Sequence, residues 1–365
     1  MPVPDFEPRP PWWGGDLQTL RNVLVKTRAD LAPWPAERIL VRLPDGDRLP
    51  VVLHSGEGGR RPLVVAIHGL TGCEDSLYLR ATTRWFLESG WPVLRVNLRG
   101  AGPAGPLCPN GGYHAGRSED LRALLSVLRW QRPELVAKGV MPLGFSLGGA
   151  MLLKFLAEND FPVEVPAAAA VSPPIDLAAA QVRLMAPRNA LYQRYILHHL
   201  RREPRASAQR PESPPERRRF ERAFAARSIQ EFDEVWTGPR NGFAGAKDYY
   251  RRCSAGPRLA EIRVPTLLIQ ALDDPWIPAA SYRAVDWAAS PALTALLPAH
   301  GGHVGFHGTG RREPWHDRVA ERFFAERLGL GVERGAQAPG RLSPAQNPLG
   351  LPQPLRRRSA ASTAK

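Results

Sequence analysis

The 365-residue sequence has few cysteines: Cys73, Cys108 and Cys253 are its only three, and no two form a CxxC pair. Neither a disulfide framework nor a thiolate zinc site is therefore indicated. The sequence also lacks a run of about 18 apolar residues, which a membrane-spanning helix needs. No basic segment leads into a short apolar one near residue 1, as in a signal peptide. We therefore expect a cytoplasmic protein without an integral membrane segment.

Acidic residues are outnumbered, with 35 Asp and Glu against 49 Lys and Arg, a net charge of +14. Two stretches hold much of the excess: residues 331–365 carry six Lys/Arg against one Glu, and residues 201–222 carry eight Arg against four Glu. Neither stretch has the interleaved aromatic residues of a single-strand-binding surface. We expect solvated surface and no specific nucleic-acid partner, while a peripheral contact with an anionic membrane stays open.

What the sequence does contain is typical of a globular α/β protein, with 43% hydrophobic residues. Short runs rich in Val, Leu and Ile alternate with longer helical patterns, and several runs are apolar throughout, as strands buried on both faces must be. This alternation predicts a doubly wound, mostly parallel eight-stranded sheet. The predicted strands are 39–43, 50–54, 63–68, 92–98, 139–145, 167–171, 266–271 and 293–298, and the predicted helices are 77–89, 117–129, 147–158, 279–288 and 315–328.

The alternation stops for about ninety residues before the seventh predicted strand. This segment is too long for a loop and has helical patterning, so we interpret residues 173–262 as a helical cap inserted into one domain that spans residues 1–330. Residues 331–365 are rich in Pro, Ser, Ala and Arg and have no apolar periodicity. We expect them to form a basic, disordered tail.

Two motifs suggest other functions, but the residues around each motif do not fit the function that it suggests. The segment from Gly100 to Gly105 matches the GxGxxG nucleotide-binding pattern, but the prolines that follow it favour a loop over the helix that the pattern needs. Three closely spaced histidines, His300, His303 and His307, suggest zinc. The glycines among them make a helix improbable, and no Glu lies between them as in a zincin site. We expect neither a metal nor another cofactor.

The strongest motif is the GFSLGG segment, which places Ser146 between a predicted strand and a predicted helix. This is the context of a nucleophile elbow, a turn so tight that Gly144 and Gly148, two residues before and after the serine, must be small. The hydroxyl then points out above the sheet, and the N–H groups of the new helix face the site. Ser146 is therefore our candidate nucleophile.

A serine hydroxyl needs a base to remove its proton and an acid to orient that base, in the chain order Ser, acid, His for this fold. The acid follows a late strand, where the sequence offers Asp273 and Asp274; the spacing to the next helix favours Asp274, and Asp273 is expected to shape the turn. The base follows the next strand. His303 has glycines on both sides that would let the loop turn its ring toward Ser146, although His300 and His307 stay open on local grounds.

An oxyanion hole requires backbone donors. We expect one to be the N–H of Leu147, directly after the serine, and the other to be the N–H of Leu70, in the loop that follows the third predicted strand. His68, at the end of that strand, is expected to have a structural role.

Taken together, the motifs resemble the YheT-like branch of the α/β-hydrolase superfamily, also called AB-hydrolase family 4. The resemblance runs from about residue 12 to residue 328, and its segments include WWGGDLQTL, HGLTGCEDSLYLR, NLRGAGP, GGYHAGRSEDL, GFSLGGAMLLKFL, VSPPIDL, EFDEVWT, GFAGAKDYYRRCS, PTLLIQALDDPWIP and GGHVGF. It implies an α/β-hydrolase fold and a triad of Ser146, Asp274 and His303. The sequence departs from the family pattern at Asp16 and Ala101, which are usually His and Cys and which lie outside the triad.

The family resemblance implies a serine esterase or lipase-like enzyme that cleaves carboxylic esters through an acyl-enzyme, with acylglycerols, phospholipids or other short- and medium-chain esters as substrates. The same triad would serve an acyltransferase or a thioesterase, and the sequence does not separate these from an esterase. A weaker alternative is a non-catalytic protein that binds an anionic membrane or nucleic acid through its Arg-rich segments. We expect a small, lipid-like ester as the partner and aromatic residues of the cap along an acyl pocket. These aromatic residues include Tyr192, Tyr195, Phe232, Trp236, Phe243, Tyr249 and Tyr250.

Overall fold

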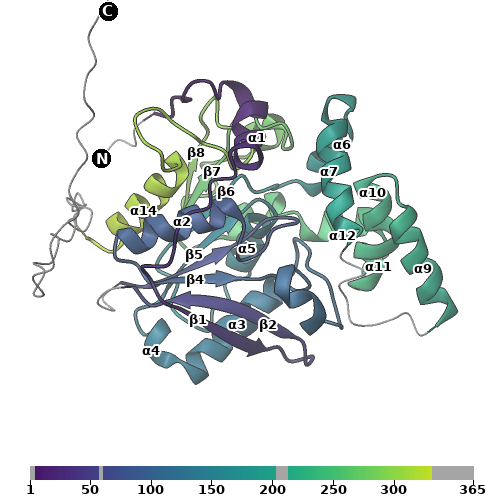
Figure 1. The fold of residues 1–365 in the computed structure, drawn as a ribbon, viewed down its shortest axis with the longest axis horizontal. Helices are drawn as coiled ribbons and strands as arrows, with labels where there is room; N and C mark the ends of the chain where they lie inside the picture. Colours follow the sequence, from purple (N-terminus) through teal and green to yellow (C-terminus); the bar gives the residue numbers. More distant parts are fainter. Residues whose placement is uncertain (1–4, 57–60, 203–212, 331–365) are drawn as a thin grey trace, which may run out of the picture. The chain divides into compact units, whose positions relative to one another are not determined.

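A computed structural model of the chain describes residues 5–56, 61–202 and 213–330. Their centre is an eight-stranded sheet in the order β1-β2-β4-β3-β5-β6-β7-β8. β2 (Arg48–His54) is antiparallel to its two neighbours, and the strands from β4 to β8 run parallel to one another. The predicted mostly parallel eight-stranded sheet is thus confirmed (Figure 1).

Helices cover both faces of the sheet because its inner strands are apolar on both sides. In β3 (Leu63–Ile67), Val64 and Ala66 belong to one buried cluster, whereas the alternate residues of the same strand belong to another. The helices α2 (Leu77–Glu88) and α14 (Trp315–Arg327) pack on the first side, and α3 (Ser118–Gln131) and α5 (Leu147–Glu158) pack on the second. This is the doubly wound arrangement that the apolar runs predict.

All eight predicted strands are present, each with boundaries shifted by a few residues. The remaining strands are β1 Ala36–Arg42, β4 Val93–Val96, β5 Val140–Phe145, β6 Ala168–Val171, β7 Thr266–Ile269 and β8 Leu293–Leu296. The prediction of a helix over residues 279–288 was too long, because α13 ends at Arg283. The helix α1 (Gly14–Val25) was not predicted from the sequence, since its WWGGDLQTL segment lacks a clear apolar stripe.

The prediction of a loop after Gly100 was wrong in detail. Residues Gly102–Leu107 form a short 3-10 helix, η1, with Pro103 in its first turn, where the missing proline N–H costs nothing. The turn is tight: a Cβ on Gly102 would lie 2.7 Å from the Cβ of Cys73. Gly102 thus packs against the segment that contains Cys73. A dinucleotide site needs a long helix that begins among the glycines, and residues Gly102–Leu107 do not form one.

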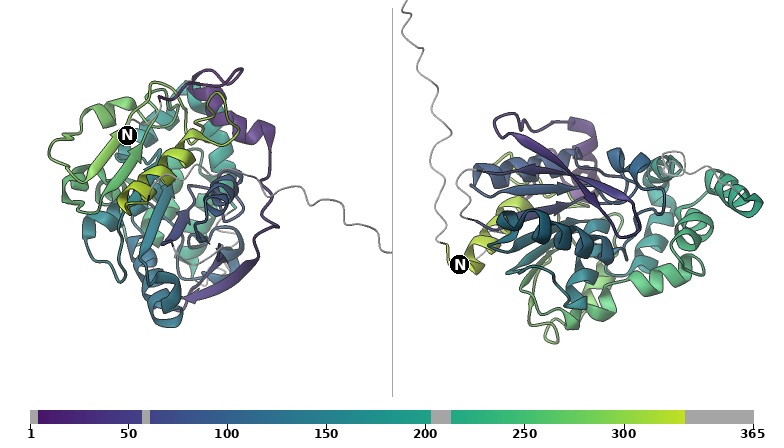
Figure 2. Two further views of the ribbon diagram at one scale, coloured as in Figure 1. Left: turned by 90° about the vertical axis from the view of Figure 1, so that its left-hand side faces the viewer. Right: turned by 90° about the horizontal axis from the view of Figure 1, so that it is seen from below.

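Between β6 and β7 the chain forms helices, which gather beside one end of the sheet (Figures 1 and 2). We call them the cap helices. Several pack around a separate apolar cluster that includes Ile196, Phe232 and Trp236.

The predicted cap limits, 173 and 262, and the extent of the 1–330 domain stay predictions. The predicted tail, residues 331–365, lies outside the described residues. The cap helices are α6 Leu177–Met185, α7 Ala190–Leu200, α9 Pro214–Ala225, α10 Ile229–Phe232, α11 Gly238–Arg240 and α12 Ala246–Cys253, with the 3-10 helices η2 Pro187–Asn189 and η4 Gly256–Glu261 and the π-helix η3 Asp233–Thr237. Outside the cap, α4 (Pro133–Val136) precedes β5.

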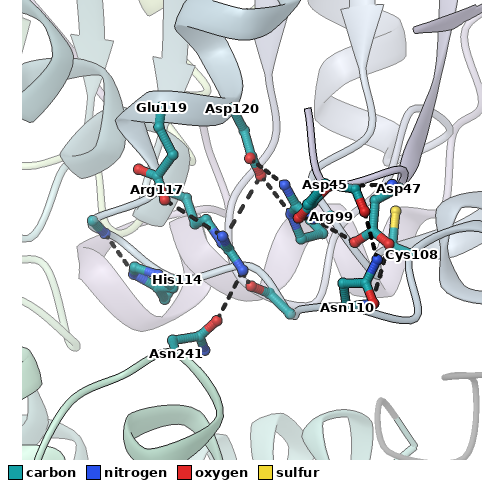
Figure 3. Close-up of polar contacts among 12 residues, drawn as sticks. Asp45, Asp47, Arg99, Cys108, Asn110, His114, Arg117, Glu119, Asp120 and Asn241 are labelled. Atoms are coloured by element: carbon teal, nitrogen blue, oxygen red, sulfur yellow. Dashed lines mark hydrogen bonds and ion pairs between the residues drawn. The ribbon is translucent and has the colours of Figure 1, made fainter. Parts of the chain in front are cut away.

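A buried polar cluster fastens the antiparallel edge of the sheet to α3 (Figure 3). The guanidinium of Arg99 lies 2.6 Å from Asp120 and 2.6 Å from Asp45, and it also pairs with Asp47. Burial disfavours the charge on Arg99, but the attraction of Asp120 and Asp45 outweighs burial and raises its pKa. Arg99 thus pairs with three carboxylates from two segments, and the cluster has the character of a structural tie.

No helix among the described residues is both long enough and apolar enough to cross a membrane.

Candidate active site

Ser146 occupies a sharp turn between β5 and α5, with φ 51° and ψ −122°. Such a conformation is costly for a residue with a side chain and persists only where its surroundings enforce it. A Cβ on Gly144 would lie 2.7 Å from the Gly148 carbonyl oxygen, and one on Gly148 would lie 2.3 Å from that of His68. The two glycines of the GFSLGG segment are therefore required by close backbone approaches, as the elbow interpretation predicts.

A chain of hydrogen bonds joins the three predicted triad residues. His303 Nε2 lies 2.8 Å from Ser146 Oγ, and His303 Nδ1 lies 2.8 Å from Asp274 Oδ2. Asp274 and His303 are almost completely buried. An imidazole held in this way can accept the serine proton through Nε2 while its Nδ1–H donates to the carboxylate.

Asp274 is fixed from both sides. Its Oδ1 accepts the backbone N–H of Trp276 at 2.8 Å and that of Ile277 at 3.1 Å, and its Oδ2 also accepts an N–H of the Gln270 side-chain amide at 3.1 Å. These donors hold the carboxylate in one orientation. The Trp276 ring lies against His303, with 4.2 Å between the ring centroids, and so restricts the imidazole plane.

The other residues that the sequence left open have different partners. Asp273 accepts the N–H of Gly302 at 2.9 Å, and its other oxygen lies 3.1 Å from Nδ1 of the exposed His300. The buried His307 contacts Asn22 through Nε2, and its pKa is lowered to about 2 by burial and nearby arginines. The three histidines are thus bound to three separate partners and do not converge on one point, as metal ligands would.

Helix α1 positions the loop that carries His303. Thr19 Oγ1 accepts the N–H of His303 at 2.8 Å, and the side-chain oxygen of Gln18 accepts the N–H of His307 at 2.7 Å. Gly302 lies so close to this helix that a Cβ would meet the carbonyl oxygen of Gly15 at 2.4 Å. Sequence reasoning missed these positioning residues, although the DLQT letters were part of the family resemblance and marked the segment.

The loop after β3 leaves one N–H available at the position expected for the oxyanion hole. The N–H of Gly69 donates to the Tyr78 hydroxyl at 2.8 Å, and that of Thr71 donates to the Tyr113 hydroxyl at 2.7 Å. Among the described residues no acceptor binds the N–H of Leu70 between them, or that of Leu147 at the start of α5. Two tyrosines thus hold the loop while leaving the two predicted donors available to a ligand.

His68 has the structural role expected of it. Its Nε2 accepts the N–H of Leu98 at 3.0 Å, and its Nδ1 lies 2.8 Å from the carbonyl oxygen of Gly69. Burial lowers the pKa of His68 to about 4, so the ring stays neutral and keeps both bonds at neutral pH. This histidine fastens the loop after β3 to the segment that follows β4.

An apolar cavity lies between Ser146 and the cap helices. Its wall on the catalytic side includes Leu70, Leu147, Trp276 and His303. On the cap side its wall is largely aliphatic and includes Leu177, Ala180, Leu184, Ile196, Leu200 and Ile229. A cavity of this composition suits a hydrocarbon chain attached to a group at Ser146.

The expectation about cap aromatics holds only in part. Tyr249 and Tyr250 line the cavity, whereas Phe232 and Trp236 are buried in the cap cluster. Tyr195 is 47% exposed and faces away from the core. Aliphatic side chains of α6 and α7 take the place that the sequence suggested for aromatic ones.

The two departures from the family pattern lie outside the cavity wall. Asp16 links α1 to the cap: its carboxylate lies 2.8 Å from Arg188 and accepts the Tyr192 hydroxyl at 3.0 Å. Ala101 is buried beside the central sheet. Neither residue lines the cavity, so neither substitution alters its surface directly.

Comparisons with known proteins agree with this fold and its motifs. The family model of the alpha/beta hydrolase fold matches residues 62–308. The chain is 33% identical to Escherichia coli "Putative esterase YheT", over 80% of this chain and 84% of that protein. It is 29% identical to a Saccharomyces cerevisiae monoacylglycerol lipase, over 73% and 58% of the two chains. The solved structure of a Pyrococcus furiosus esterase superposes with a TM-score of 0.54 at 17% identity, covering 82% of this chain and 95% of that one. The chain therefore belongs to the α/β-hydrolase family, in its YheT-like branch.

Proposed function

We propose that this protein is a serine hydrolase that cleaves carboxylic esters through an acyl-enzyme formed on Ser146. The observation that carries the proposal is the unbroken series from Asp274 to His303 to Ser146, with 2.8 Å at each step, facing an apolar cavity. Relatives named as an esterase and as a monoacylglycerol lipase support carboxylic esters as the substrate class.

In the first half of the reaction His303 Nε2 takes the proton from Ser146 Oγ as the oxygen attacks the ester carbonyl. The negative charge on the carbonyl oxygen would be bound by the N–H groups of Leu70 and Leu147. Collapse of the intermediate expels the alcohol, which receives the proton from His303. In the second half the same imidazole activates a water that hydrolyses the acyl-Ser146 ester, while Asp274 stabilises the imidazolium in both halves.

The cavity favours an ester with a hydrocarbon chain. Burying one methylene group in such a wall stabilises binding by about 0.8 kcal/mol. Acylglycerols, phospholipids and other esters of short or medium chain fit this description. No Lys or Arg is among the described residues that line the cavity.

Ser146→Ala tests the proposal. The variant should lose p-nitrophenyl ester hydrolysis by at least about 10⁴-fold and should not be labelled by a fluorophosphonate probe. Ser126→Ala is the matched control, because Ser126 lies at the surface of α3 and bonds only to its own helix. If the probe still labels Ser146→Ala, Ser146 is not the nucleophile. Addition of an alcohol would separate a hydrolase from an acyltransferase, since only the latter would convert most of the acyl-enzyme into a new ester.

A further inference from the structure

The largely apolar cavity contains one carboxyl group that the proposed mechanism does not use. Asp233 and Tyr250 both line the cavity, and the Tyr250 hydroxyl donates to Asp233 Oδ2 at 2.7 Å. Both side chains are more than nine-tenths buried. A polar pair in such a wall is costly unless its hydrogen bonds are satisfied.

Among the described residues, Asp233 has no positively charged partner. None of the ion pairs among the described residues includes it, and its hydrogen-bond partners are the hydroxyls of Tyr250 and Thr237. Burial raises the pKa of Asp233 to about 6, so the group is largely ionised at neutral pH. A carboxylate can accept about four hydrogen bonds. Two donors therefore leave it able to accept another from a molecule in the cavity.

The backbone at Asp233 is unusual. Residues Asp233–Thr237 form a π-helix between α10 and α11, and single π-helical turns inside α-helices occur frequently at functional sites. Asp233 and Thr237, four residues apart, lie on the same face of this segment and both line the cavity. The backbone hydrogen bonds thus depart from the regular α-helical pattern in the segment whose polar side chains line the cavity.

The polar pair and the predicted catalytic residues Ser146 and His303 line the same cavity. The Tyr250 ring packs against that of Tyr249, with centroids 5.2 Å apart, and the Tyr249 hydroxyl accepts the N–H of Ala115. Leu70, the predicted oxyanion donor, packs on the cap cluster that contains Phe232, the residue before Asp233. One ligand could therefore extend from Ser146 to Asp233 within a single cavity.

We propose that Asp233, supported by Tyr250, accepts a hydrogen bond from a hydroxyl group on the chain that fills the cavity, so that the enzyme selects hydroxylated esters over plain ones. The inference rests on the proposed function, because it assumes that the ester is cleaved at Ser146. A neutral hydroxyl fits this wall better than an ammonium group, since the surrounding aliphatic residues make removal of a full charge from water far more costly.

The test measures kcat/KM for p-nitrophenyl octanoate and for analogues with one hydroxyl at carbon 2, 3, 6, 7 or 8 of the chain, because 4- and 5-hydroxy esters release p-nitrophenol by spontaneous lactonisation. The wild-type protein should favour one hydroxyl position over the others by about 10-fold or more, the effect of one hydrogen bond to a charged acceptor. The double variant Asp233→Leu/Tyr250→Phe removes donor and acceptor together, and its profile should be flat. Asp233→Asn keeps an acceptor oxygen without the charge, so its preference should fall only in part.

Asp248→Asn is the matched control. Asp248 also accepts hydrogen bonds within the cap and lies on the same helix as Tyr250, but it does not line the cavity. Its profile should equal that of the wild type. Because each profile is a ratio between substrates of one protein, a change in the amount of folded enzyme does not alter it.

Three results would overturn the inference. One is a flat profile in a wild-type protein that hydrolyses the esters, and another is a preference that survives in the double variant. The third is an Asp233-dependent preference for an amino group over a hydroxyl, which would assign the site to a cation. If the wild-type protein hydrolyses none of the esters, the proposed function itself fails, which is a different result from a flat profile.

Discussion

The loops at the ends of the parallel strands and the cap helices contribute to one cavity in different ways. In the strand-end loops, backbone groups and close glycine contacts fix each polar side chain: the N–H groups of Trp276 and Ile277 hold Asp274, and Thr19 holds the backbone of His303. The cap presents side chains from the faces of helices, and most of them are aliphatic. The comparison suggests that the loops determine the chemistry, while the cap determines which ester reaches it.

The largest expected effect separates His303 from its neighbour His300. His303→Ala should reduce ester hydrolysis by about 10⁶-fold, because the general base is lost. His300→Ala should stay within a few-fold of the wild type, since the His300 side chain is 55% exposed and contacts Asp273. Steady-state kinetics on one p-nitrophenyl ester measures both. A comparable loss in His300→Ala would mean that the loop chemistry is assigned to the wrong histidine.

The two adjacent aspartates give the next largest effect. Asp274→Asn should lower kcat by about 10⁴-fold, because an amide at this place no longer stabilises the imidazolium and favours the wrong tautomer. Asp273→Asn removes a carboxylate that shapes the turn, so we expect a loss of about 10-fold or less. Equal losses in the two variants would contradict the division of roles between them.

A substitution in the cap should change which ester chain lengths are hydrolysed without abolishing ester hydrolysis. Leu184 of α6 lies in the aliphatic wall, and Leu184→Trp would fill part of the cavity beside it. We expect kcat/KM for long-chain esters to fall by about 10-fold or more, the effect of losing a few methylene contacts, with a smaller change for acetate esters. A series of p-nitrophenyl esters of increasing length measures this. Parallel losses for all lengths would show that the cap also positions the triad.

The smallest expected effect concerns stability and Asp233. Its pKa in the folded protein is raised from 3.8 to about 6 by burial, so between these values the folded state binds a proton that the unfolded state has lost. The free energy of unfolding should therefore fall as the pH rises through this range, by about 3 kcal/mol in total for this group. Urea unfolding should show Asp233→Asn gaining about 2 kcal/mol relative to the wild type between about pH 4.5 and about pH 7.5. If the difference in unfolding free energy between the two proteins does not change with pH, Asp233 is not a buried carboxyl group with a raised pKa.

The sequence predicted the sheet well because its strands are short apolar runs between turns, and that signal is local. It predicted the neighbourhood of Ser146 for the same reason, since the elbow needs glycines at fixed spacing. It did not predict α1, whose buried Gln18 and Thr19 face the histidine loop nearly 300 residues away. The choice of His303 over His300 also depends on such distant contacts, and local spacing alone left it open.

The cap was harder to predict in detail. Helical patterning identified it as helical, but which side chains face the cavity depends on how the helices cross and not on residue type. Phe232 and Trp236 were therefore expected at the cavity and are found in the cap core, whereas Tyr250 lines the cavity as expected. Its polar partner Asp233 was not expected there. The π-helical turn that presents Asp233 has no clear sequence signal.

The most direct test of the account is to trap the covalent intermediate. The protein is mixed with a slowly deacylating p-nitrophenyl ester, quenched in acid, digested and analysed by mass spectrometry. The account predicts an acyl group on the peptide that contains Ser146, formed together with a burst of p-nitrophenol and absent in Ser146→Ala. Ester turnover without a burst and without an acylated Ser146 peptide would contradict it.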